Sequence, residues 1–178
     1  MPADRALDGR PHRADARRPR PGTGRRFVDI EGNVAPEDCF LSRQIISHPH
    51  PDPRGFLAEF ADRVSASGEC SSALYASGLP AKVRPEAVRP IFESMVALSD
   101  HGDLMRRFLA LPCARMFMYG EENRSLSYLP GLVEHGVELA EIAHSGHWPM
   151  YANAPEMWSR IVAFVRATEA DDEERRAS

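Results

Sequence analysis

The stretch that decides the fold is residues 110–165, ALPCARMFMYGEENRSLSYLPGLVEHGVELAEIAHSGHWPMYANAPEMWSRIVAFV. It holds two short apolar runs, residues 115–119 and 137–142, each bounded by proline or glycine and separated by a helix-length segment. Runs of this kind are typical of buried strands, and their spacing favours a strand–helix–strand unit with parallel strands. The second run leads into a turn that carries His147. Such a turn lies at the edge where open α/β sheets bind their ligands.

The rest of the chain predicts one further strand and a set of helices. Phe27-Val28-Asp29-Ile30 reads as a strand ended by Glu31-Gly32-Asn33, and the three prolines of residues 48–53 exclude regular structure. Helices are expected at residues 36–46, 54–66, 69–77, 85–98, 103–109 and 154–167. We expect Gly78-Leu79-Pro80 to break the third of these, and Asn153 with Glu156 to cap the last.

The two ends of the chain differ from its middle in composition. Residues 1–26 hold eight Arg and three Asp with many prolines and glycines, so we predict a disordered Arg/Pro-rich head with no polyanion-binding role. Residues 27–168 are expected to form one α/β domain, and residues 169–178 a solvated, acidic tail. The head is about +5 and the rest about −9, so the mildly acidic body argues against a nucleic-acid partner.

The spacing of the cysteines and the hydropathy of the chain indicate the cellular compartment to expect. The three cysteines are scattered without a Cys-x-x-Cys pair, which favours a reduced, cytoplasmic protein. We expect no membrane association, because no apolar run approaches the roughly 18 residues that a span needs. The charged N-terminus lacks the apolar core of a secretory signal.

The order of elements from Phe27 onward resembles the C-terminal part of the α/β-hydrolase fold, in the branch of haloalkane dehalogenases and epoxide hydrolases. The resemblance covers about 150 of the 178 residues. It implies about three parallel strands, with residues 34–110 as a helical cap insertion over the active site. It also implies hydrolysis of an ester, epoxide or carbon–halogen bond in a small-molecule substrate, without a cofactor.

The resemblance assigns catalytic roles to three residues. His147, in the turn after the last strand, matches the general base of the family. The acid that orients such a histidine follows the sixth strand in some members, and Glu31 at the end of FVDIEGN matches that place. Most members carry the acid after the seventh strand, where this chain has Gly120-Glu121-Glu122-Asn123; Asn123 aligns with it, and Glu122 is the reserve candidate.

The nucleophile of the family is missing from the sequence. Its serine lies in a Gly-x-Ser-x-Gly turn, and no such pentapeptide occurs in these 178 residues. We therefore expect a truncated fragment that is inactive as written. We also expect self-association through the sheet edge that the missing strand would cover.

Two alternatives of other classes remain. One is a non-catalytic binding or interaction module that uses the cap surface. The other is a metal site at Glu141, His144 and His147, whose spacing by three would suit a helix. Because this stretch reads as a strand and a turn, we expect no metal there. Trp148, Met150 and Tyr151 could line a pocket or pack under the last helix, and we favour packing under the helix.

Overall fold

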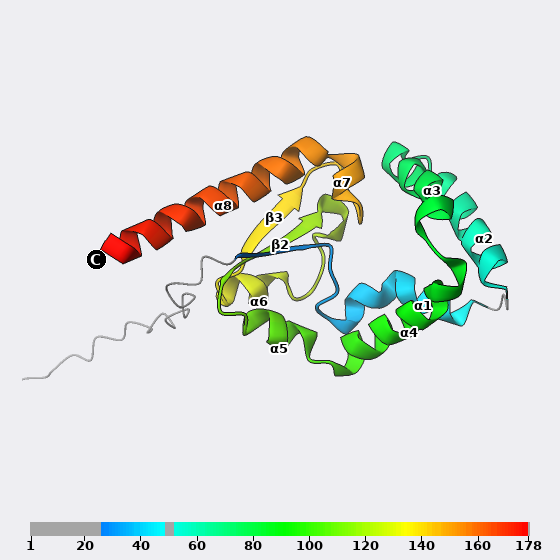
Figure 1. The fold of residues 1–178 in the computed structure, drawn as a ribbon, viewed down its shortest axis with the longest axis horizontal. Coiled ribbons are helices and arrows are strands. Elements are labelled where there is room, and N and C mark those ends of the chain that lie inside the picture. Colours follow the sequence, from blue (N-terminus) through cyan, green and yellow to red (C-terminus); the bar gives the residue numbers. More distant parts are fainter. Residues whose placement is uncertain (1–25, 49–51, 178) are drawn as a thin grey trace, which may run out of the picture.

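The computed structural model describes residues 26–48 and 52–177. The head predicted to be disordered lies outside these residues except for Arg26. The chain is of the α/β class, with a small parallel sheet and many helices (Figure 1). In the described residues no helix is both long and apolar enough to cross a bilayer.

The sheet has three parallel strands, as the sequence predicted. They are β1 (Arg26–Ile30), β2 (Ala114–Gly120) and β3 (Glu138–Ile142), in the order β1-β2-β3. The register places Val28 opposite Met116, and Met118 opposite Ala140. All three strands therefore end at one edge of the sheet, which is the edge predicted to hold the site.

Helices cover both faces of the sheet (Figure 1). Helix α8 (Ala154–Ala177) packs Met157 and Phe164 against Met116 and Met118 of β2. On the opposite face, α5 (Leu104–Leu109) and α6 (Leu129–Glu134) pack against Phe117 and Tyr119 of β2. Helix α5 therefore belongs to the sheet and not to a cap, although its residues fall inside the predicted insertion. We call β1–β3 with the 3₁₀ turn η2 (Glu121–Asn123), α5, α6, α7 (Pro149–Ala152) and α8 the sheet body.

The remaining helices form a second group beyond the carboxyl ends of the strands (Figure 1). They are the 3₁₀ turn η1 (Pro36–Cys39), α1 (Phe40–Ser47), α2 (Pro53–Ser65), α3 (Cys70–Lys82) and α4 (Pro85–His101), which we call the helical layer. The predicted break at residues 78–80 was wrong, because α3 continues to Lys82. Pro80 lies in the last turn, where a missing N–H costs one hydrogen bond, and the neighbouring Leu79 is buried.

The acidic tail is mostly exposed where its burial is described, but it is helical, and the expected helix end at residue 167 was wrong. Helix α8 runs on through residues 169–177. Arg26 in β1 forms ion pairs with Glu169 at 3.9 Å and Asp172 at 3.8 Å, and it donates a hydrogen bond to Thr168. These contacts join the acidic tail to the first strand.

Candidate active site

The candidate site begins with the backbone at the carboxyl edge of the sheet. The β2 strand ends at Gly120, where a Cβ atom would lie 2.3 Å from the carbonyl oxygens of Ser145 and Gly146. Only glycine leaves room for the turn after β3 to come this close to β2. That turn carries His147, so Gly120 allows the histidine to approach the ends of the other two strands.

Glu31 is held at this edge by hydrogen bonds. Its side chain is 7% exposed. Oε1 accepts a hydrogen bond from Gly120 N at 2.5 Å, and Oε2 accepts one from Asn123 Nδ2 at 2.8 Å. Asn123 therefore orients the acid rather than the histidine. The carboxylate has a defined position and cannot rotate away without losing both bonds.

His147 faces Glu31 across the sheet edge. Its Nδ1 lies 3.3 Å from Glu31 Oε2, and its side chain is 39% exposed. When Nδ1 carries the proton and donates to the carboxylate, Nε2 is the unprotonated nitrogen and can act as a base. The structure thus brings together two predicted residues that are 116 positions apart in the chain.

Glu122, the reserve acid, lies near this pair but in another environment. A Cβ atom on Gly146 would lie 2.5 Å from Glu122 Oε2, so this carboxyl group packs against the turn before His147. Burial raises the pKa of Glu122, and the nearby carboxyl groups of Glu69 and Glu121 raise it further. Of the two candidate acids, Glu31 is the one in contact with the imidazole.

An apolar pocket of about 390 Å³ opens beside Glu31 and His147. Its walls come mainly from the helical layer, and its polar residues come mainly from the segment after β1. The polar and charged lining residues include Glu31, Asn33, Asp38, Ser42 and His147. The apolar and aromatic ones include Leu41, Ile45, Phe56, Leu57, Phe60, Tyr75, Leu79, Val88, Phe92, Met95 and Trp148. A pocket of this size and composition is suited to a small organic molecule.

Two aromatic rings join the two groups of helices at this pocket. Tyr75 of α3 stacks on Trp148, with ring centroids 4.3 Å apart and planes at 20°. Of the two places expected for Trp148, the structure shows the less favoured one, because its ring lines the pocket. Tyr75 was not predicted as a site residue. It lies 73 residues before Trp148, and no local sequence pattern indicates that the two rings stack.

Asp38 is a second carboxylate at the polar end of the pocket that the sequence did not reveal. Its Oδ2 accepts hydrogen bonds from Val34 N and Ala35 N, both at 2.7 Å, and Tyr128 donates its O–H to Oδ1 at 2.8 Å. Burial raises the pKa of Asp38, although these hydrogen bonds lower it in part. Burial also raises the pKa of Tyr128, and the charge of Asp38 adds to that effect.

The residues of the metal alternative do not converge. Glu141 forms an ion pair with Arg124 at 2.9 Å, and His144 lies in the turn with a φ of 53°. Within residues 26–48 and 52–177, no group of three or more His, Cys, Asp or Glu side chains could hold a metal ion.

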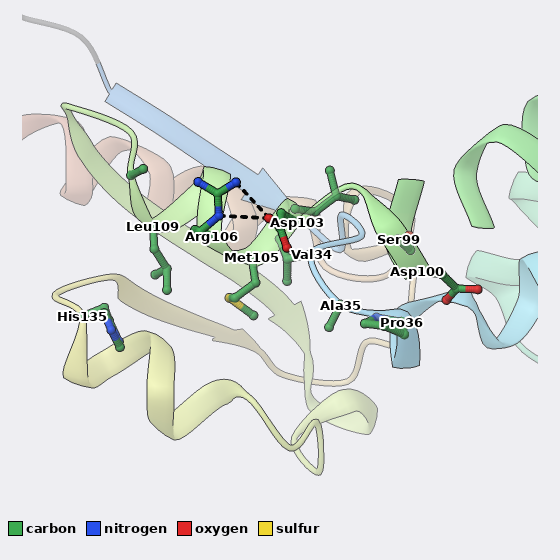
Figure 2. A pocket seen from close by; sticks show the side chains of 12 residues that line it. Val34, Ala35, Pro36, Ser99, Asp100, Asp103, Met105, Arg106, Leu109 and His135 are labelled. Carbon is green, nitrogen blue, oxygen red and sulfur yellow. Dashed lines mark hydrogen bonds and ion pairs between the residues drawn. The ribbon is translucent and has the colours of Figure 1, made fainter. Parts of the chain in front are cut away.

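A second hollow, of about 670 Å³, lies away from Glu31 and His147 between α4, α5 and the end of α6 (Figure 2). Figure 2 shows Asp103 and Arg106 at its rim, joined by hydrogen bonds of 3.0 and 2.8 Å. Because its charged groups are already paired, it offers no reactive side chain comparable to His147.

Comparisons with protein-family models, with curated proteins and with solved structures found no match to this chain.

Proposed function

We propose that this chain carries the base and the acid of an α/β-hydrolase-fold enzyme that cleaves an ester, epoxide or carbon–halogen bond. His147 is the base and Glu31 the acid that orients it. The sheet body would be the C-terminal part of that fold, and the helical layer its cap. The observation that carries the proposal is the 3.3 Å contact between Nδ1 of His147 and Oε2 of Glu31 beside an apolar pocket.

The chemical role of the pair follows from its geometry. The carboxylate of Glu31 fixes the tautomer of His147 and stabilises the imidazolium that forms when Nε2 takes a proton. The proton would come from a water molecule or from a nucleophile outside these 178 residues, since they contain no Gly-x-Ser-x-Gly turn. The proposal therefore assigns general-base chemistry to these residues and leaves the nucleophile to another group.

Hydrolysis of a p-nitrophenyl ester tests the assignment. The wild-type chain, His147→Ala, Glu31→Gln and a control, His101→Ala at the exposed end of α4, would be compared at equal concentration. Because these residues lack the nucleophile turn, we expect at most a slow hydrolysis in which His147 activates a water molecule. His147→Ala should abolish that hydrolysis, Glu31→Gln should lower it, and His101→Ala should leave it unchanged. Equal rates in the wild type and in His147→Ala would refute the role of His147.

A second candidate function is a non-catalytic module that binds a small molecule. The apolar pocket favours it, together with the lack of the nucleophile turn. No hydrolysis by the wild-type chain, combined with saturable ligand binding, would favour this candidate over the enzyme.

We also propose that the chain self-associates through β1. Glu31 N donates to Met118 O at 2.9 Å, so in this parallel pair the N–H and C=O groups of Val28 and Ile30 point away from β2. In the described residues no strand pairs with that side of β1. Val28→Pro removes one outward N–H and is expected to shift a dimer to monomer in size-exclusion chromatography with light scattering. A wild-type monomer at high concentration would refute this proposal.

The three cysteines are free thiols, which supports a reducing, cytoplasmic location.

A further inference from the structure

The two ends of the pocket beside His147 differ in polarity. Its carboxylates, Glu31 and Asp38, lie at the end formed by the sheet edge and the segment after β1. The opposite end is formed by hydrocarbon side chains of the helical layer, including Phe56, Phe60 and Leu79. A ligand therefore meets polar groups at one end only, and its remaining surface must be apolar.

The polar end holds two carboxyl groups, and His147 is the one basic side chain among the described residues that line the pocket. Asp38 accepts three hydrogen bonds and Glu31 two, in addition to the contact with His147. Among the described residues that line the pocket there is no Arg or Lys. An anionic ligand would lose its hydration shell and meet two carboxylates, and both effects oppose binding.

The volume of the pocket limits the size of the ligand. An engineered protein cavity of about 150 Å³ accommodates benzene. A pocket of about 390 Å³ therefore has room for two or three ring equivalents. Stacked Tyr75 and Trp148 add flat aromatic surface to the wall.

We infer that this pocket selects an uncharged, largely apolar molecule of two or three ring equivalents and rejects its anionic analogues. The inference deepens the proposed function, because both concern the same site. It requires only the shape and charge of the pocket, so it can be tested without any catalytic turnover.

Two dyes that differ by one charged group provide the test. N-phenyl-1-naphthylamine is neutral, and 8-anilinonaphthalene-1-sulfonate has the same ring systems with an added sulfonate. Titration followed by dye fluorescence is expected to show saturable binding of the neutral dye and at least tenfold weaker binding of the anionic one. The double variant Glu31→Gln with Asp38→Asn should reduce that preference to less than threefold.

A matched pair of variants on α3 locates the dye. Leu79 is buried and lines the pocket, whereas Leu74 on the same helix is 54% exposed. Leu79→Trp fills the pocket and is expected to weaken binding of the neutral dye at least tenfold, while Leu74→Trp leaves it unchanged. Circular dichroism melts of both variants check that each one folds.

The outcomes separate this inference from the proposed function. Equal binding of the two dyes, or binding that survives Leu79→Trp, would overturn the inference. Selective binding of the neutral dye without any His147-dependent ester hydrolysis would support the inference and overturn the enzyme proposal. Hydrolysis that depends on His147, with no preference between the dyes, would support the enzyme proposal and overturn the inference.

Discussion

The sheet body and the helical layer use buried apolar side chains in different ways. In the sheet body, Met116, Phe117, Met118 and Ile142 are at most 1% exposed and fill the space between strands and helices. In the helical layer, the buried cluster consists of Ile45, Phe56, Leu57, Phe60, Leu79 and Val88, and every one of these lines the pocket. The first region is packed for stability, whereas the second encloses a space.

This difference implies that equivalent substitutions have different consequences in the two regions. Truncation in the sheet body creates a new cavity and loses packing on all sides. Truncation in the helical layer enlarges a cavity that already exists. Stability should therefore respond most in the first region, and ligand binding in the second.

The largest expected effect comes from truncating one phenylalanine in each region. Phe117→Ala should lower the free energy of unfolding by about 4 kcal/mol, and Phe60→Ala by roughly half as much, because Phe60 already borders empty space. Urea denaturation measures both. If Phe117→Ala fails to fold, Phe117→Leu should still cost about 1–2 kcal/mol. Equal losses of unfolding free energy at the two positions would contradict the proposed difference between the two regions.

An intermediate effect is expected from removing one helix cap in each region. Asp52 accepts hydrogen bonds from Arg54 N and Gly55 N at the start of α2, and Asn153 accepts one from Glu156 N at the start of α8. Replacing either with alanine should cost about 1 kcal/mol. Only Asp52→Ala should also weaken binding of the neutral dye, because α2 forms the pocket wall. A comparable loss of binding in Asn153→Ala would contradict this.

The smallest effect on stability is expected at Glu122, whose carboxyl group lies near that of Glu69 where the two regions meet. Glu122 of the sheet body has a pKa above the usual 4.5, through burial and then the charge of Glu69 in the helical layer. The folded state therefore binds this proton more tightly than the unfolded state, and stability falls as pH rises from about 4.5 through the folded pKa.

Glu122→Gln removes this penalty. We expect the variant to be more stable than wild type by about 0.5 kcal/mol at pH 7 and equal to it at pH 4. Thermal melts across this pH range measure the difference. Lower stability of Glu122→Gln at pH 7 would show that the charged form makes a favourable contact.

The sequence predicted the sheet body better than the helical layer. Apolar runs bounded by Gly and Pro located β2 and β3 to within a residue or two, because strand burial leaves a local pattern. The placement of His147 followed from the end of a parallel strand, whereas that of Glu31 came from the resemblance to the α/β-hydrolase fold. Asp38 and the Tyr75–Trp148 stack were missed because they depend on how distant helices pack, and no local pattern encodes that.

Local rules also failed where a long-range contact outweighed them. Pro80 did not end α3, because the adjacent Leu79 is anchored in the buried cluster of the helical layer. Helix α8 continues into the acidic tail, where Arg26, more than 140 residues away, forms ion pairs with Glu169 and Asp172. Both errors arose from treating a short segment by its own composition.

The backbone of Glu31 has a consequence for the evolution and engineering of this chain. Its φ of 51° lies in the left-handed region, which costs a non-glycine residue about 1 kcal/mol or more. A glycine at this position would relieve the strain and would also remove the carboxylate that faces His147. Glycine would also lose the hydrogen bonds that the carboxylate accepts from Gly120 and Asn123, so the strained backbone is retained together with a carboxylate held opposite His147.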